Sequence, residues 1–321
     1  MVLRLLSDGR FHSGEQIGAA LGVSRTAVWK QLSRWQERGL LIHVVPGKGY
    51  RWVEPVEWWD ESLMRCMMAP GAEGLLYSLQ IEQTVTSTNT VIFDRIVSER
   101  MSGIVCLAEE QTAGRGRRGR QWVAPFGAGF YCSVGWCFDE GVAALEGLSL
   151  AVGLAVARVL IDYGIAGVGL KWPNDIMCRD AKMGGILIEM QMDGDGRCLV
   201  VVGIGINLSL HAGMQEIVGR SVADLQTESG RPLERNKLGA KLLEAVLLLL
   251  KGYGQGRFAS MRDDWCRLDI LNGKDVQLMG LAEPLVGIAR GVDSHGALLI
   301  DTPDGQRTIN SGEVSLRWES R

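Results

Sequence analysis

The chain has 321 residues, of which 46% are apolar and 22% charged, which is typical of a soluble globular protein with two or three domains. No apolar run reaches the roughly 18 residues that a membrane span needs, so we expect no membrane association. Seven scattered cysteines without a C-x-x-C spacing predict unpaired thiols and a cytoplasmic location. The four histidines have no partner at metal-ligand spacing, which argues against a protein-bound zinc site.

The charge is distributed unevenly along the chain. Residues 1–53 contain eight Lys or Arg and three Asp or Glu, a local charge of +5, so the remainder carries −8 of the formal total of −3. This asymmetry indicates a basic module that meets nucleic acid and an acidic body that does not.

The first elements predict a winged helix-turn-helix domain over residues 1–60. A short helix over 2–6 precedes a helix opened by Ser13, with Gln16 completing a capping box, and ending at Gly22. Ser24 caps a third helix that runs to about residue 38, and strands at 41–45 and 49–53 form the wing. A three-helix bundle with a solvated face is the less favoured alternative. The candidate DNA-binding residues are Ser24, Arg25, Thr26, Lys30, Gln31, Arg34 and Lys48.

Residues 61–268 predict an α+β domain, a mostly antiparallel sheet backed by helices. The predicted strands cover 75–85, 104–108, 130–138, 168–172, 185–192 and 198–208. The predicted helices cover 86–99, 148–163, 233–252 and 257–268. Residues 269–321 show short alternating strands between turn signals, which predicts a small β-barrel.

The run GRGRRGR at residues 114–120 is the most informative motif. It places four arginines and three glycines in seven residues, and such a density of like charge favours an anion among them. The glycines allow the backbone to curl and direct N–H groups at that anion. We therefore expect a phosphate or carboxylate clamp that closes over its ligand; a solvated basic loop that contacts RNA or nothing is the alternative.

Three further motifs carry polar groups at turns or on small-residue faces. KWPND at 171–175 predicts a sharp strand-to-loop turn from which Lys, Asn and Asp leave in different directions. The Lys is suited to bind a phosphate, the Asn a purine edge, and the Asp Mg²⁺ or a ribose hydroxyl. Lys182 before two glycines is expected to point into a pocket, although an edge-protecting lysine would look the same. The small face of GIGIN at 203–207 leaves room for a flat ligand, but as a dinucleotide motif it is weak.

With these motifs the chain resembles the bacterial bifunctional biotin–protein ligases that also repress the biotin operon. The resemblance runs in order through VPGKGY (45–50), STN (87–89), QTAGRGRRGR (111–120), KWPND, KMGGIL (182–187), GIGIN and GEVSLR (312–317). It implies a class II synthetase-like ligase domain and an SH3-like C-terminal barrel. It also implies that biotin and MgATP form biotinyl-5′-AMP, from which biotin passes to a lysine of the biotin carboxyl carrier protein.

The resemblance also implies roles for individual residues. Those implied to hold biotin are Ser87, Thr88, Asn89, Gln111, Gly114, Arg115, Gly116, Arg117 and Lys182. Those implied to lie near the adenylate are Arg118, Arg120, Trp122, Asn174, Asn207 and Arg317. Those implied to act in catalysis are Arg115, Arg117, Lys182, Lys171 and Asp175, with Mg²⁺ arriving on the ATP phosphates. The segment 211–230 shows little of the family pattern, although the family has there a loop ordered by the adenylate.

The implied partners are the carrier protein, operator DNA of biotin biosynthesis genes, and a second copy of the chain that joins through the central sheet when adenylate binds. A biotin-sensing repressor without catalysis is the main alternative. A ligase for lipoate or octanoate is disfavoured, because those enzymes lack the Arg/Gly run and the winged module.

Overall fold

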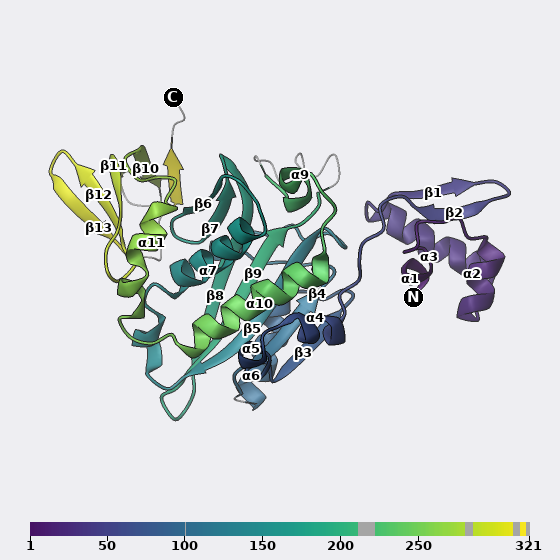
Figure 1. Cartoon of the computed structure of the whole chain (residues 1–321), viewed down its shortest axis with the longest axis horizontal. Coiled ribbons are helices and arrows are strands. Elements are labelled where there is room, and N and C mark those ends of the chain that lie inside the picture. Colours follow the sequence, from purple (N-terminus) through teal and green to yellow (C-terminus); the bar gives the residue numbers. More distant parts are fainter. Residues whose placement is uncertain (100, 211–221, 280–284, 311–314, 319–321) are drawn as a thin grey trace.

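The computed structural model describes residues 1–99, 101–210, 222–279, 285–310 and 315–318 (Figure 1). They form a basic helical module, a large central sheet with helices on both faces, and a smaller C-terminal sheet. The predicted α+β class and the order of its three parts are confirmed.

The N-terminal module has the predicted winged helix-turn-helix elements. They are α1 (Val2–Leu5), α2 (Gly14–Leu21), α3 (Arg25–Glu37), β1 (Ile42–Val45) and β2 (Gly49–Trp52). The Ser13–Gln16 capping box forms as predicted, and the Ser24 hydroxyl accepts a hydrogen bond from the Ala27 N–H at the start of α3. Because both caps supply acceptors to otherwise orphaned N–H groups, they fix where α2 and α3 begin.

One phenylalanine of the central domain inserts into the base of this module. Phe126 is 3% exposed and lies with its ring centroid 4.8 Å from Trp35, 6.1 Å from Trp52 and 5.6 Å from Trp58. Arg38 at the end of α3 also forms an ion pair with Glu110 of the central domain. The two domains are therefore packed together rather than only tethered.

The central sheet has seven strands in the order β3-β4-β5-β9-β8-β7-β6. The pair β3–β4 is parallel and every other pair is antiparallel, as predicted. The strands are β3 (Ser78–Glu82), β4 (Ile104–Ala108), β5 (Gly129–Phe138), β6 (Val168–Lys171), β7 (Asp175–Cys178), β8 (Ala181–Met192) and β9 (Cys198–Asn207).

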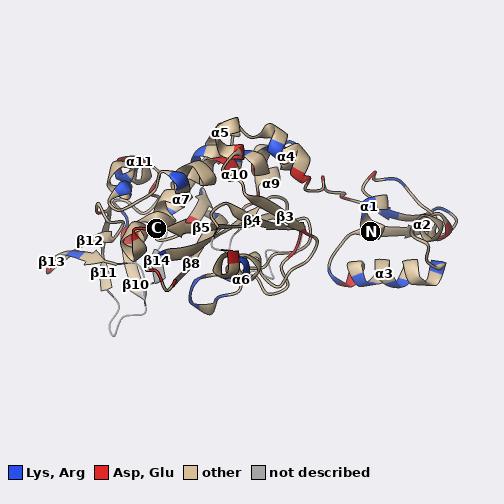
Figure 2. Cartoon of the chain, turned by 90° about the horizontal axis from the view of Figure 1, so that it is seen from below, with Lys and Arg blue, Asp and Glu red and all other residues tan. Residues whose placement is uncertain are grey.

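Helices cover both faces of this sheet. Figure 2 shows α10 (Arg235–Lys251) and α6 (Thr88–Glu99) on opposite sides of it. The long apolar helix α7 (Leu148–Asp162) packs against α10 and against β6 and β8. The shorter segments are α4 (Glu61–Met67), α5 (Pro70–Glu73), α9 (Leu225–Ser229), α11 (Arg262–Arg267) and the 3-10 turns η1 (Arg117–Gly119), η2 (Gly141–Leu145) and η3 (Arg257–Ser260).

Residues Gly141–Asp162 are long and apolar enough to cross a membrane, by length and composition alone. In the fold they are η2 and α7, and α7 buries residues such as Leu148, Val152, Val156 and Leu160 in the main hydrophobic core. The apolar character of this segment is therefore explained by its place against the sheet.

Several predicted boundaries were wrong. The predicted helix over 257–268 is divided into η3 and α11, and α4 and α5 were not predicted. Strand β7 was also missed, because KWPND is the turn of a hairpin between β6 and β7 rather than an exit into a loop. Strand β8 begins four residues earlier than predicted, so Lys182 lies within a strand.

The C-terminal residues form five antiparallel strands in the order β13-β12-β11-β10-β14, which confirms the strand pattern predicted there. They are β10 (Asp275–Met279), β11 (Leu285–Val292), β12 (Leu298–Thr302), β13 (Gly305–Ile309) and β14 (Ser315–Trp318). The indole N–H of Trp172 donates to the Gly296 carbonyl at 2.9 Å, which joins the β6–β7 turn to the β11–β12 turn of this sheet.

Candidate functional site

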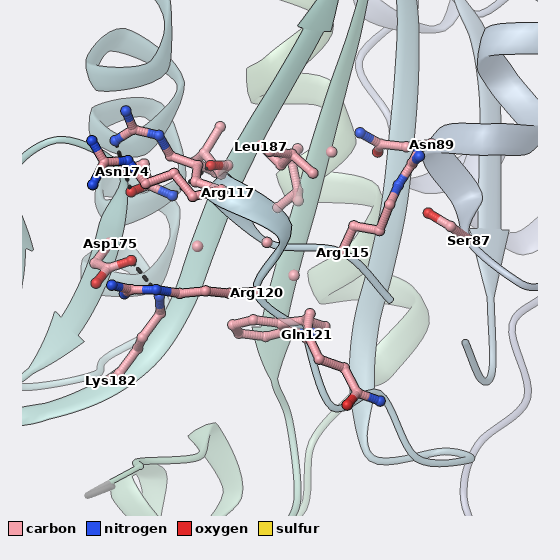
Figure 3. A pocket seen from close by; sticks show the side chains of 18 of the residues that line it. Ser87, Asn89, Arg115, Arg117, Arg120, Gln121, Asn174, Asp175, Lys182 and Leu187 are labelled. Carbon is pink, nitrogen blue, oxygen red and sulfur yellow. Dashed lines mark hydrogen bonds and ion pairs between the residues drawn. The ribbon is translucent and has the colours of Figure 1, made fainter. Parts of the chain in front are cut away.

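A cavity of about 220 Å³ lies where the Arg/Gly loop, the β6–β7 hairpin and the strands β8 and β9 meet (Figure 3). The predicted site residues that line it are Ser87, Thr88, Asn89, Gln111, Arg115, Gly116, Arg117, Arg118, Arg120, Trp122, Lys171, Asn174, Asp175 and Lys182. Four segments that are far apart in the sequence thus meet at one site.

At one end of the cavity, Gln111 fixes the start of α6. Its side-chain oxygen accepts from the Thr88 N–H at 2.8 Å and lies 3.0 Å from the Thr88 hydroxyl. Ser87, Thr88 and Asn89 are all buried. Residues 87–89 and the segment that contains Gln111, both expected to hold biotin, are therefore hydrogen-bonded to each other. These bonds fix the positions of their polar groups.

The Arg/Gly loop is folded on itself. The Gly116 N–H donates to the Arg120 carbonyl at 2.7 Å, and the Trp122 N–H donates to the Gly114 carbonyl at 2.9 Å. A Cβ on Gly114 would lie 2.5 Å from the Trp122 carbonyl oxygen, so this glycine permits a close backbone approach. Gly114 lines an adjoining hollow, together with Thr112 and Glu189, rather than the main cavity.

Arg117 is the loop arginine that enters the site most deeply. Burial lowers the pKa of its guanidinium, the neighbouring Arg118 lowers it further, and Asp175 acts in the opposite direction. Its Nη1 lies 3.5 Å from the Asn174 side-chain oxygen, a contact at the outer limit of a hydrogen bond. An arginine stays protonated under such a shift, so Arg117 provides a fixed and partly desolvated positive charge.

Lys182 and Asp175 face each other across the β7–β8 pair and form an ion pair, as Figure 3 shows. Their side chains are 14% and 21% exposed, and the Lys182 ammonium lies 5.6 Å from the centre of the Trp122 ring. Because the pair opens onto the cavity, Lys182 can turn from Asp175 toward an anionic ligand. Among the described residues no group of three or more His, Cys, Asp or Glu is placed to hold a metal ion.

The KWPND turn is anchored on both sides. The Asn174 amide donates to the Ile186 carbonyl at 2.8 Å, and the Ile186 N–H donates to the Asn174 carbonyl at 2.9 Å. The Trp172–Pro173 peptide bond is cis. One N–H of the Asn174 side-chain amide is thus bonded to β8, and the amide keeps a second N–H and its oxygen for other contacts.

The glycines of GIGIN make room for protein side chains as well as for the cavity. A Cβ on Gly203 would lie 2.2 Å from the Asn89 side-chain oxygen, and a Cβ on Gly205 would lie 2.7 Å from the Trp122 ring. The space that we expected for a flat ligand is thus partly filled by Asn89 and Trp122, which form part of the cavity wall.

Besides Gly114, two predicted residues lie outside the cavity lining. Asn207 is 6% exposed, and its amide donates to the Lys182 and Ala223 carbonyls at 3.4 and 3.0 Å, so it supports the Lys182 strand instead of facing the site. Arg317 lies on β14 opposite Gln277, and its side chain is outside the described part of the chain. Residues 211–221 of the segment expected to close over adenylate are also outside it.

Sequence reasoning missed Ser133 and Glu189. Ser133 is fully buried on β5, and its hydroxyl lies 2.7 Å from the Thr88 hydroxyl and 2.6 Å from the Asn89 oxygen. Glu189 accepts from both Asn89 and Arg115. Glu189 alternates along β8 with Gly185 and Leu187, which both line the cavity, and this period of two is the signal that could have identified it.

The second candidate site is the surface of the N-terminal module. Of the predicted DNA-binding residues, Arg25, Thr26, Lys30, Arg34 and Lys48 are exposed, Gln31 is half-buried, and the hydroxyl of Ser24 serves as the cap of α3. Lys30 and Arg34 are one helical turn apart, so α3 presents a cationic stripe of the kind that meets a phosphate backbone.

Comparison with known proteins identifies the class. Residues 81–207 match the biotin/lipoate A/B protein ligase family, residues 273–317 the biotin protein ligase C terminal domain, and residues 1–51 a helix-turn-helix domain.

Individual relatives narrow this class. The chain is 38% identical to the bifunctional ligase/repressor BirA of Salmonella typhimurium over 98% of this chain and 96% of the relative. The chain is 37% identical to the bifunctional ligase/repressor BirA of Escherichia coli, again over 98% of this chain and 96% of the relative. The biotin protein ligase from Aquifex aeolicus in complex with biotin and ATP matches with a TM-score of 0.64 and 30% identity, covering 76% of this chain and 100% of that one. The chain therefore belongs to the family of bifunctional biotin ligase/repressors.

Proposed function

We propose that this protein activates biotin with MgATP to biotinyl-5′-AMP and transfers the biotinyl group to a lysine of the biotin carboxyl carrier protein. The observation that carries the proposal is the cavity in which Arg117, Lys182 and the Gln111–Thr88 pair meet. The complex of the Aquifex aeolicus ligase with biotin and ATP supports both substrates.

The chemistry needs positioned charge rather than a nucleophilic side chain. In the first step a carboxylate oxygen of biotin attacks the α-phosphorus of ATP and pyrophosphate leaves. Both reactants are anionic, so fixed cations lower the barrier by offsetting their repulsion. In the second step the carrier lysine amine attacks the acyl carbon, AMP leaves, and the amine loses a proton.

The proposed roles are those that the family resemblance implies, and the cavity lining is consistent with them. Ser87, Thr88, Gln111 and the backbone of the Arg/Gly loop hold the ring of biotin, and Arg117 and Lys182 balance charge on its carboxylate and on the α-phosphate. Trp122, Asn174, Arg118 and Arg120 border the adenylate. Asp175 and Lys171, which line the same cavity, would help to hold the phosphates or the Mg²⁺ that they carry. When closed over the ligand, the loop would exclude water and so protect the mixed anhydride from hydrolysis.

Biotin-dependent exchange of pyrophosphate into ATP tests the first step. Arg117→Ala and Lys182→Ala should each reduce kcat/KM by roughly two orders of magnitude, the scale of losing one fixed charge-stabilising donor. Arg179→Ala is the matched control, because Arg179 pairs with Glu228 away from the cavity and is 66% exposed. Exchange in the two cavity variants at the wild-type rate would remove the proposed roles.

We further propose that biotinyl-5′-AMP acts as corepressor. Adenylate would favour a dimer through the central sheet, and two winged modules would then meet a palindromic operator of biotin biosynthesis genes. Analytical ultracentrifugation with and without the adenylate measures the coupling; an equal monomer fraction in both would contradict it.

The alternative, a biotin sensor without catalysis, would bind biotin and DNA but fail in pyrophosphate exchange. Intact Arg117 and Lys182 in one cavity favour the enzyme. A cytoplasmic location is part of the proposal and is supported by the seven free cysteines.

A further inference from the structure

Trp29 on α3 is exposed, although the other tryptophan of that helix packs into the protein. The ring centroid of Trp35 lies 4.8 Å from that of Phe126, whereas Trp29 is 54% exposed. The buried residues of α3 are Val28 and Leu32, so the stripe that faces the core of the module runs through them and leaves Trp29 on the neighbouring, outward face. Trp29 therefore does not complete that core.

The surface around Trp29 is cationic. Arg25 and Thr26 lie one helical turn before it and Ser33 one turn after it, since residues three or four apart on a helix are neighbours. From residue 24 to residue 36 the chain contains three Lys or Arg and no Asp or Glu. Figure 2 shows α3 along one side of the module, with its lysines and arginines spaced along it. Such a surface fits a polyanion that also offers apolar groups.

The position of Trp29 along α3 favours contact with bases. It is the fifth residue of the helix, and in helix-turn-helix domains the first part of the recognition helix contacts base edges in the major groove. The other end of α3 is tied to the central domain through the ion pair of Arg38 with Glu110. It is therefore the end with Trp29 that can enter a groove.

The chemistry of an indole selects one base. The faces of the ring are apolar, and its Nε1–H donates a hydrogen bond but cannot accept one. The C5 methyl of thymine is the one apolar group that base pairs display in the major groove, and the O4 acceptor of the same base lies beside it. Thymine is thus the base whose edge matches both properties of the ring.

We propose that Trp29 reads a thymine methyl group in the major groove of each half-site and so determines part of the operator sequence, while Lys30 and Arg34 hold phosphates. This role of Trp29 rests on the repressor part of the proposed function and adds to it the base that is recognised. Loss of one methyl group from such an apolar contact should weaken binding about 4-fold, the effect of unburying one carbon.

The test combines changes in the DNA with changes in the protein. The full-length chain, with biotin, ATP and Mg²⁺, is used to enrich a duplex from a random-sequence library. Uracil then replaces thymine at one symmetric pair of positions at a time, which removes only methyl groups. In fluorescence anisotropy, one such replacement should weaken wild-type binding about 4-fold for each half-site and so about 16-fold for two. Trp29→Ala should bind the thymine and uracil duplexes equally, with an unchanged slope of log affinity against log salt because no phosphate contact is lost.

Two further variants serve as references. Trp29→Phe keeps an apolar ring and should retain most of the discrimination between thymine and uracil. Tyr77→Ala is the matched control, because Tyr77 is an aromatic residue of the central domain that is 56% exposed, and this variant should discriminate as the wild type does. Since Trp29 is a surface residue, the Tm of Trp29→Ala should stay within about 2 °C of the wild-type value, which separates lost recognition from lost folding.

Two results would overturn the role of Trp29 and leave the repressor standing. One is a wild-type protein that binds all thymine and uracil duplexes equally. The other is a Trp29→Ala variant that still discriminates as the wild type does, or that binds both duplexes more weakly by the same factor, since the indole would then meet a phosphate or a protein surface. If the library yields no enriched duplex, the repressor itself is contradicted together with this role.

Discussion

Gly205→Ala tests whether Trp122 is held in place by the bare backbone of β9. The new Cβ would lie 2.7 Å from Cε2, 2.9 Å from Nε1 and 3.0 Å from Cζ2 of the indole. Three contacts at or below 3.0 Å cannot be relieved by a small adjustment, so the ring must move. The backbone N–H of Trp122 donates to the Gly114 carbonyl, so a displacement of the ring that reaches the Trp122 backbone should also shift the Arg/Gly loop.

The size of the effect follows from overpacking. Forcing one methyl group into a filled site costs about 1–3 kcal/mol. If that cost falls on the conformation that binds ligand, affinity for biotinyl-5′-AMP falls about 5- to 150-fold. Isothermal titration calorimetry measures this loss, and circular dichroism reports whether the fold is retained.

Two matched variants sharpen the result. Gly194→Ala changes a glycine of the β8–β9 turn whose Cβ would meet nothing within 4 Å, so it should bind as the wild type does. Gly205→Ala/Trp122→Ala removes the clash and should recover the thermal stability that Gly205→Ala loses. Wild-type affinity in Gly205→Ala would refute the reasoning, because Trp122 would then not depend on β9 for its position.

Three further predictions concern other parts of the chain. Lys30→Ala/Arg34→Ala should weaken DNA binding and reduce the slope of log affinity against log salt by about 2, since each residue is expected to meet one phosphate; an unchanged slope in fluorescence anisotropy would contradict this. Burial raises the pKa of Asp269 from 3.8 to about 6, so its carboxyl favours the folded state at acid pH and this contribution is lost as pH rises through 6. Asp269→Asn should accordingly stabilise the protein by about 1–3 kcal/mol at pH 8 and by about half as much at pH 5, and equal Tm shifts at both values would be the contrary result. Phe126→Ala should lower the free energy of unfolding by about 3–5 kcal/mol, because the ring packs between the tryptophans. The variant should also expose residues 54–60 to protease. An unaltered digestion pattern would show that the ring does not hold the domains together.

The elements that the sequence predicted well have local causes. Ser13 and Ser24 start helices by capping them, and the Asp-Gly turn between β8 and β9 closes a hairpin whatever surrounds it. The family membership was also predictable, because its motifs are read directly from the chain.

The errors arose where distant segments decide the local structure. Strand β7 follows Pro173 and is four residues long, so its strand character comes from pairing with β6 and β8 rather than from its own pattern. The short helices α4 and α5 are stabilised by packing on α10. Both helices also begin with local signals that the sequence prediction did not use, the Asp60 cap of α4 and Pro70 at the start of α5.

The same distinction applies to the site. The residue types in the Arg/Gly run and KWPND indicated anion binding, and the structure brings them to one cavity. The Ser133 and Glu189 contacts were missed because each joins residues at least 44 positions apart. Asn207 was misplaced for a similar reason: its partners lie on β8 and near α9, and the sequence around it does not indicate them.

The most direct test of the ligase is the mass of its acceptor. The protein is mixed with biotin, ATP, Mg²⁺ and a biotin carboxyl carrier domain, and the carrier is weighed by mass spectrometry. We predict that the carrier gains one biotinyl group, that the gain requires both biotin and ATP, and that it is slowed in Lys182→Ala. If the mass of the carrier is unchanged although the protein still binds biotin, the proposed ligase activity is contradicted and the alternative of a biotin sensor without catalysis is favoured.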